Sequence, residues 1–139
     1  MRYLIVLCLS LAMSIVASAA EFKIVANNAT QISSLSRDEL KAIFMKRNPR
    51  WKDGMDIAPV DQAASSPTRA SFTQAIHGKP VAAIESFWQQ QIFSGRQVPP
   101  ITKASDDEVL AFVKANPGAI GYVSSAAPTG GVRVIAVGQ

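Results

Sequence analysis

The residues of this sequence that are best placed to bind a ligand lie in one short segment, Ser65-Ser66-Pro67-Thr68-Arg69. The segment begins a predicted helix in which Ser66 is the N-cap and Pro67 is the first helical residue. Free backbone N–H groups and the positive end of the helix dipole point at one spot there, and the hydroxyl groups add donors. Arg69 could hold an oxyanion through two parallel hydrogen bonds. The segment therefore indicates either an oxyanion site or an ordinary helix cap with Arg69 solvated on the outer face of the helix.

Other side chains that could do chemistry lack the partners that catalysis or metal binding requires. His77 is the single histidine, and without a cysteine or a nearby acidic partner it is typical of a structural or surface histidine. Asp106-Asp107-Glu108 reads as the acidic first turn of a helix, which the helix dipole favours. The sequence holds no Gly-x-Ser-x-Gly elbow, glycine-rich phosphate loop or dinucleotide fingerprint. We therefore predict no catalytic residue, no metal and no cofactor.

The first twenty residues have the three-part pattern of a secretory signal peptide. Arg2 precedes an apolar run from Tyr3 through Met13, and the small residues Ala17-Ser18-Ala19-Ala20 follow as a cleavage site. A retained transmembrane helix is the alternative, but it needs about 18 apolar residues with anchoring flanks, and serines interrupt this run. The sequence therefore predicts a signal peptide over residues 1–20 and a periplasmic or secreted location for the remainder, with no membrane span after cleavage.

Composition limits what the mature chain, residues 21–139, can be. Cys8 lies inside the predicted signal, so the mature chain has no thiol for a disulfide scaffold or a cysteine-based zinc site. Its length is enough for one domain with a sizeable core. The formal net charge of the whole chain is +4, and the basic residues are scattered rather than clustered. Export and this mild charge argue against a nucleic acid partner and favour small anions or an acidic envelope surface.

Local patterns predict strands that alternate with helices. Ser36 with Glu39 and Ser105 with Glu108 have the spacing of capping boxes, and each precedes an apolar stripe at helical spacing. The expected strands are 22–26, 57–60, 119–123 and 132–137, and the expected helices start at Ser36, Ser66, Pro80 and Ser105 and end by Asn48, Gly78, Ser94 and Asn116. This order predicts a single α/β domain of three layers, with a mostly parallel sheet of four or five strands flanked by helices.

Several of these patterns coincide with one known family. The chain resembles the phosphate-type substrate-binding proteins of ABC transporters, in the following order: Leu35-Ser36-Arg37-Asp38-Glu39-Leu40 with Ile43-Phe44, Trp51, Ile57-Ala58-Pro59-Val60, Ser66-Pro67-Thr68-Arg69 with Phe72, and Asn116-Pro117-Gly118-Ala119-Ile120-Gly121-Tyr122-Val123. The last of these segments is the most specific. The likeness extends over nearly the whole mature chain but covers only one lobe, whereas full-length members close two lobes around the ligand. It implies one lobe of a type 2 periplasmic binding protein and a tetrahedral oxyanion as ligand.

The resemblance also assigns site residues and shows two departures. The family's loop resembles Arg-x-x-x-Ser-Gly-Thr, and Ser66 and Thr68 match its Ser and Thr. Gln62 stands in the position of the Arg and removes a permanent charge. Pro67 stands in the position of the Gly and removes a backbone donor. Arg69 could replace the lost charge, but nothing restores the lost N–H, so tight phosphate capture by one lobe open to water is not expected.

Two functions follow as hypotheses. The first is an exported, non-enzymatic binding module that contacts a small oxyanion weakly through Ser65, Ser66 and Thr68, together with Arg69. The second is a cell-envelope interaction or accessory protein that keeps the fold and has lost the ligand, as the two departures from the motif suggest. A partner protein or a second copy could supply the wall that the missing lobe would form. A hydrolase would rest on fold-level analogy alone.

Two further residues could lie on a contact surface. Trp51 is in a predicted loop beside Arg47, Arg50 and Lys52, and could be an exposed contact or part of the core. Arg96 is in a rigid loop that leads to Pro99-Pro100, and could face a partner or water.

Overall fold

The computed structural model describes residues 21–138, and the predicted signal peptide lies outside them. The described residues form, in chain order, β1 (Phe22–Ala26), β2 (Ser34–Ser36), α1 (Arg37–Phe44), β3 (Ala58–Gln62), α2 (Pro67–His77), α3 (Val81–Phe93), β4 (Ile101–Lys103), α4 (Asp106–Ala115), β5 (Ala119–Ser124) and β6 (Arg133–Gly138). None of the helices in this part of the chain has the length and apolar character needed to cross a membrane.

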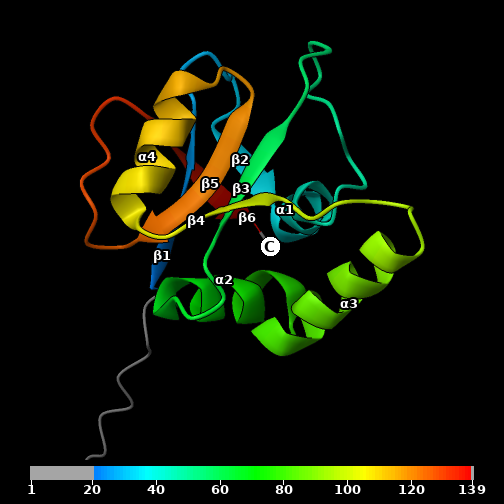
Figure 1. Cartoon of the computed structure of the whole chain (residues 1–139). Helices are drawn as coiled ribbons and strands as arrows, with labels where there is room; N and C mark the ends of the chain where they lie inside the picture. Colours follow the sequence, from blue (N-terminus) through cyan, green and yellow to red (C-terminus); the bar gives the residue numbers. More distant parts are fainter. Residues whose placement is uncertain (1–20, 139) are drawn as a thin grey trace, which may run out of the picture.

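All the described strands join one sheet in the order β2-β6-β1-β5-β3-β4 (Figure 1). β1 runs antiparallel to its neighbours β5 and β6, while the pairs β2–β6, β3–β5 and β3–β4 are parallel, so every strand except β1 has the same direction. The predicted mostly parallel α/β sheet is therefore confirmed. The sheet has six strands rather than the expected four or five, because β2 and β4 are only 3 residues long and too short to show an alternating pattern.

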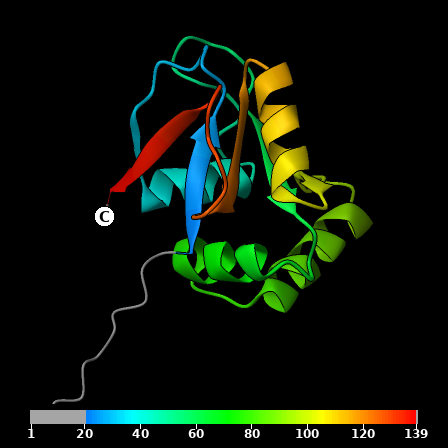
Figure 2. The same ribbon diagram turned by 90° about the vertical axis from the view of Figure 1, so that its left-hand side faces the viewer.

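Helices cover both faces of the sheet, which gives the predicted three layers (Figure 2). On one face α1 and α2 bury a cluster that includes Leu40, Phe44 and Phe72 against Ile24 and Tyr122 of the sheet. On the other face α4 packs its valines against β1, β3 and β5, with Val109, Val113, Val25, Val60 and Val123 in a second cluster. α3 is attached outside this sandwich, and its buried residues Ile84 and Trp88 contact Met45.

Local signals position the helices as predicted. Ser36 and Glu39 form a reciprocal capping box, in which Glu39 N donates to Ser36 Oγ at 3.1 Å and Ser36 N donates to Glu39 Oε2 at 2.9 Å. Ser105 caps α4 by accepting from Glu108 N at 3.2 Å, although the Glu108 carboxylate accepts from Ala104 N instead of Ser105 N. α2 ends at Gly78, which adopts φ 65° in the left-handed region that glycine tolerates best.

Trp51 belongs to the core and is not an exposed contact. Its side chain is buried, and its indole Nε1 donates to the Gly118 carbonyl at 3.1 Å. The bond ties the long loop between α1 and β3 to the start of β5. A Cβ at Gly118 would lie 1.9 Å from the carbonyl oxygen of Asp56 in the same loop, so the backbones approach too closely for any side chain.

We predict that Gly118→Ala lowers the free energy of unfolding by about 3 kcal/mol, because backbone atoms rather than a flexible side chain must move. Gly130→Ala is the matched control, since a Cβ there has nothing within 4 Å, and its effect is expected to stay within about 0.5 kcal/mol. Urea unfolding followed by tryptophan fluorescence measures both. Equal stability of the two variants would contradict the close approach.

Candidate functional site

The candidate site lies at the edge of the sheet where parallel strands end and helices begin. β3 ends at Gln62 and β5 ends at Ser124, while α2 begins at Pro67 and α4 at Asp106. This carboxyl edge is where open α/β sheets bind their ligands. The fold therefore brings the predicted Gln62 and Ser66 together with Asp106 and Ser124, two residues that the sequence did not assign to the site.

The Ser66 hydroxyl is engaged in two hydrogen bonds within the chain. It accepts from Arg69 N at 3.2 Å, which is the expected N-cap of α2, and it donates to Gln62 Oε1 at 2.7 Å. The hydroxyl proton therefore points to Gln62 rather than to the space in front of the helix. An incoming anion would have to displace this bond to use Ser66 as a donor.

Gln62 is buried and connects the start of α2 to the start of α4. Its Nε2 group donates to Asp106 Oδ1 at 2.8 Å and to the Tyr122 carbonyl at 3.0 Å. Asp106 also accepts from Ser124 N at 3.1 Å and from Ser124 Oγ at 2.6 Å. The site thus contains a carboxylate whose lone pairs are held by the chain itself.

Asp106 remains charged under ordinary conditions. Burial by itself would raise the pKa of its carboxyl, but the hydrogen bonds from Ser124 and Gln62 outweigh burial and lower the pKa below its usual value. A fixed negative charge bonded to Gln62 disfavours a second anion nearby. The sequence indicated only an acidic helical turn here, because Gln62 and Asp106 are 44 residues apart in the chain and meet only in the folded domain.

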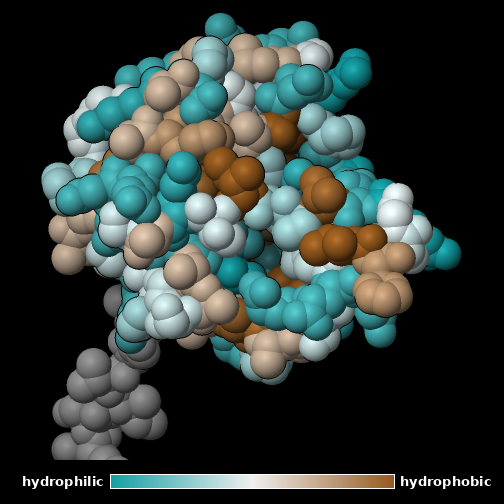
Figure 3. Space-filling model, in the orientation of Figure 1, coloured by the Kyte–Doolittle hydropathy of each residue, from teal (hydrophilic) through white to brown (hydrophobic). Residues whose placement is uncertain are grey.

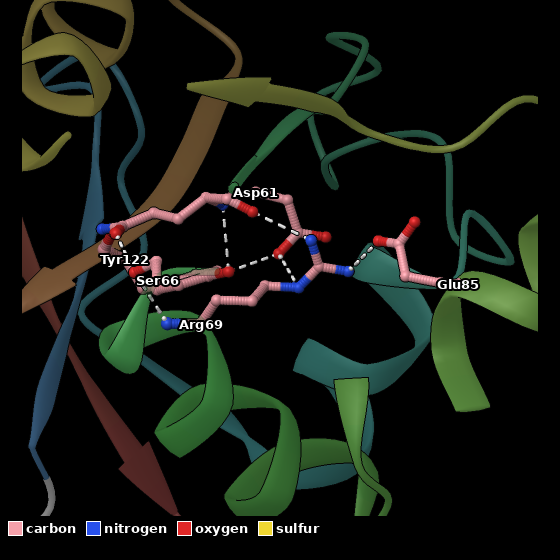
Figure 4. Close-up of polar contacts among 6 residues, drawn as sticks. Asp61, Ser66, Arg69, Glu85 and Tyr122 are labelled. Carbon is pink, nitrogen blue, oxygen red and sulfur yellow. Dashed lines mark hydrogen bonds and ion pairs between the residues drawn. The ribbon is translucent and has the colours of Figure 1, made fainter. Parts of the chain in front are cut away.

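Arg69 is buried at 2% exposure, so the alternative that it is solvated on the outer face of α2 is wrong. Its guanidinium points away from the start of α2 and lies between Asp61 and Glu85 (Figure 4). There, Nη1 donates to the Gln62 carbonyl at 2.8 Å. Nε is 3.3 Å from Asp61 Oδ1, and Nη2 is 3.0 Å from Glu85 Oε1. All three nitrogen atoms of the guanidinium thus face groups of this chain, and no free pair of N–H groups points toward the start of α2.

Asp61 is the buried partner of Arg69. The Tyr122 hydroxyl donates a short hydrogen bond to Asp61 Oδ1 and accepts from Gln62 N at 3.0 Å. The Tyr122 ring is stacked on Phe72, with ring centroids 3.9 Å apart. Burial raises the pKa of Asp61 despite the opposing charge of Arg69, and burial together with the Asp61 charge raises the pKa of Tyr122. This network belongs to the core and contacts the site through the backbone of Gln62.

The groups left to face a ligand at the start of α2 are few. Pro67 has no N–H, and the N–H of Arg69 is taken by Ser66. Within residues 21–138, the Thr68 N–H and the hydroxyls of Ser65 and Thr68 form no hydrogen bond, and Ser65 is exposed while Thr68 is half-buried. Within α2 and the residues before it, the Thr68 N–H and the hydroxyls of Ser65 and Thr68 are therefore among the donors that remain.

His77 closes α2 on the side away from this edge. It is buried, its ring meets the edge of Phe72 at 5.9 Å, and its Nδ1 lacks a hydrogen-bond partner. Burial, followed by the charges of Lys41, Arg69 and Lys79, lowers the pKa of His77 to about 4. Residues 21–138 contain no group of three or more His, Cys, Asp or Glu side chains arranged to hold a metal ion.

Comparison with known proteins decides the family. Residues 13–133 match the PBP superfamily domain. The chain belongs to this family. The resemblance to phosphate-type substrate-binding proteins that the sequence motifs indicated is thereby confirmed.

Solved structures show the same fold. An ABC-type phosphate transport receptor from Vibrio cholerae is 24% identical with a TM-score of 0.67, and the alignment covers 84% of this chain and 46% of that one. A protein from Clostridium perfringens described as a phosphate ABC transporter substrate-binding protein with bound phosphate is 20% identical with a TM-score of 0.68, covering 84% and 44%. PstS from Borrelia burgdorferi is 17% identical with a TM-score of 0.61, covering 86% and 47%. This PBP domain therefore spans less than half the length of these proteins.

We predict that Arg69→Met lowers the free energy of unfolding by about 3–5 kcal/mol at pH 7, because it leaves Asp61 buried without its counter-ion. Arg50→Met is the matched control, since Arg50 forms an exposed ion pair with Asp56 at 3.5 Å and should cost less than about 1 kcal/mol. Chemical denaturation measures both.

The loss caused by Arg69→Met should also shrink toward acidic pH. The folded-state pKa of Asp61 is raised, so protonation stabilises the folded form as pH falls toward the ordinary value of 3.8 and relieves the unpaired charge. A loss that is independent of pH, or no larger than that of Arg50→Met, would show that Asp61 and Arg69 do not form a buried pair.

We predict that His77 makes the fold sensitive to acid. Its pKa falls from 6.5 in the unfolded chain to about 4 in the folded one, so the unfolded chain binds more protons between these values. The contribution of His77 to stability is fully present above pH 6.5 and is lost as pH falls toward 4, to an extent of up to about 3 kcal/mol. The difference in unfolding free energy between the parent and His77→Gln should therefore change over this range, whereas parallel pH curves would refute the assignment.

Proposed function

We propose that this chain is an exported, non-enzymatic binding module that contacts a small oxyanion such as phosphate weakly at the start of α2. The observation that carries the proposal is the set of donors left at the carboxyl edge of the sheet, namely the Thr68 N–H and the hydroxyls of Ser65 and Thr68. They surround the positive end of a helix of 11 residues. The phosphate in the name of the C. perfringens protein supports the ligand class.

Weak binding follows from how the remaining groups are used. Ser66, Gln62 and Arg69 are bonded to one another or to Asp61 and Glu85, so they enter the site only if those bonds break. The negative charge of Asp106 lies within the same network. A ligand at this edge is also open to water, because Ser65 is exposed and Thr68 is only half-buried. We expect a dissociation constant in the millimolar range, which corresponds to about 4 kcal/mol of binding free energy.

Export is part of the proposal. Residues 1–20 act as a signal peptide, and the domain of residues 21–139 works in the periplasm or after secretion. The expected result is that protein recovered from the cell exterior or the periplasmic fraction begins at Ala20 or Glu21 by intact mass. Recovery of the uncleaved chain in the cytoplasm alone would reject this part of the proposal.

A second candidate function is an envelope interaction or accessory protein that keeps the fold without the ligand. Two observations favour it: the inward orientation of Arg69, and a cluster of exposed apolar side chains at the end of α3 and after it, Ile92, Phe93, Val98 and Ile101. In this case a protein surface replaces the small ligand. Anion titration separates the two functions, since only the first requires an anion to bind.

Calorimetric titration with phosphate and with sulfate tests the anion site. We predict millimolar binding by the parent chain and about three- to ten-fold weaker binding by Thr68→Ala, which removes one hydroxyl donor. Asp106→Asn should bind at least about three-fold more tightly, because it removes a negative charge while its amide can still bond to Ser124 and Gln62. Pro67→Gly should also bind more tightly, because it restores a backbone N–H.

Ser33→Ala, at an exposed residue before β2, serves as the control for a serine outside the start of α2. Thermal unfolding of each variant shows that the fold is retained. Absence of heat with either anion at about 10 mM in the parent, in Asp106→Asn and in Pro67→Gly would reject the anion function and leave the interaction function.

A further inference from the structure

α3 presents an unusual outer surface, which we call the α3 surface. Its exposed positions carry no charged side chain, only small, amide, aliphatic or aromatic ones: Ala82, Ala83, Ser86, Gln89, Gln90, Ile92 and Phe93. The single charged residue of α3 is Glu85. An exposed helical face without charge is atypical of solvated helices, and depletion of charge together with an aromatic residue is characteristic of the core of a protein interface.

Phe93 is the most exposed large apolar residue of the described chain, at 97%. Ile92, at 53%, adds to the apolar area on α3, and Val98, at 62%, extends this area into the loop after the helix. Figure 3 shows brown side chains gathered over the end of α3 and the loop that follows, beside a hollow. Leaving a whole phenyl ring in water forgoes a large hydrophobic contribution, which burial against a partner would recover.

The α3 surface combines a hollow with a protruding ring. Ser86, Gln89, Gln90, Phe93 and Ser94 line a shallow hollow of about 550 Å³. A protruding ring at one end of the helix and small side chains at the other end can fit each other when two copies of α3 pack antiparallel. A two-fold axis near Gln89 and Gln90 places Phe93 of each copy over Ser86 of the other, and lets the amides of the glutamines meet at the centre.

Charge points to the same arrangement. Glu85, whose side chain is 45% exposed, and Asp61 share the single cation Arg69, and all three line a hollow of about 430 Å³ that Gln89 and Ile92 also border. Arg96 is exposed at the opposite end of the helix and forms no ion pair within residues 21–138. In an antiparallel pair, Arg96 of each copy lies at the Glu85 end of the other, which balances two carboxylates with two guanidinium groups.

We propose that the chain forms a symmetric dimer through the α3 surface, in which Phe93 of each copy occupies the hollow beside Ser86 of the other and Arg96 pairs with Glu85. The occupant of the surface is thus a second copy of this chain. The dimer goes beyond the anion-binding function and does not depend on it, because its residues lie on α3 and in the following loop, whereas the anion donors lie at the start of α2.

Sedimentation velocity over about 1–200 µM tests the dimer, with protein produced from the full coding sequence. We expect a reversible monomer–dimer equilibrium with a micromolar dissociation constant. Phe93→Asp should weaken association at least about thirty-fold, because two rings are lost per dimer, and Arg96→Glu should weaken it several-fold. Val134→Asp is the matched control, since Val134 is exposed at 47% on β6, far from α3, and association should persist in this variant.

Cross-linking provides a test that does not depend on stability. In a Cys8→Ser background, Gln90→Cys should form a disulfide-linked dimer on mild oxidation, because the two-fold axis brings both copies of this position together. Ala111→Cys, on the exposed face of α4, should remain monomeric. A parent chain that is monomeric at 200 µM, or a dimer that Phe93→Asp leaves intact or that Val134→Asp dissociates, would overturn the proposal.

Discussion

The buried guanidinium of Arg69 is the interaction on which this lobe depends most. From α2 it reaches Asp61 of β3, the carbonyl that ends β3 at Gln62, and Glu85 of α3. One cation therefore ties a central strand to two helices. A buried charge of this kind requires carboxylate and carbonyl partners, because an unpaired ion in the interior costs several kcal/mol. α3 relies on this link in particular, since only Ile84 and Trp88 bury it against the rest of the molecule.

The same interaction limits what the carboxyl edge of the sheet can bind. A cation at the start of α2 would attract an oxyanion, but here the cation faces inward and the nearest ionised group in front is Asp106. Hydrogen bonds from Gln62 and Ser124 keep that carboxylate in place. The edge belongs to the fold of the PBP superfamily, and most of the donors at this edge are bonded within the chain. Stability and ligand affinity thus compete for the same few side chains.

The single lobe also leaves surface that a larger protein could cover. The chain spans less than half the length of the solved structures it matches, and its most exposed apolar side chains lie at the end of α3 and in the loop that follows. Phe93 and the uncharged face of α3 contribute nothing to the cores of the domain, which are built from α1, α2 and α4 against the sheet. Selection for folding alone does not account for such a surface, whereas association does.

The sequence by itself determined the layered α/β class and the family. It also determined the helix starts at Ser36, Ser66 and Ser105 and the end of α2 at Gly78. These features depend on caps, apolar stripes and turns, which are formed by residues close together in the chain. Only the tertiary structure decided the rest. β2 and β4 exist because longer strands pair with them. The inward orientation of Arg69 depends on carboxylates 8 residues before it and 16 residues after it. Asp106 meets Gln62, 44 residues earlier, only when α4 has packed on the sheet. These contacts join residues distant in the chain, and no local pattern encodes them.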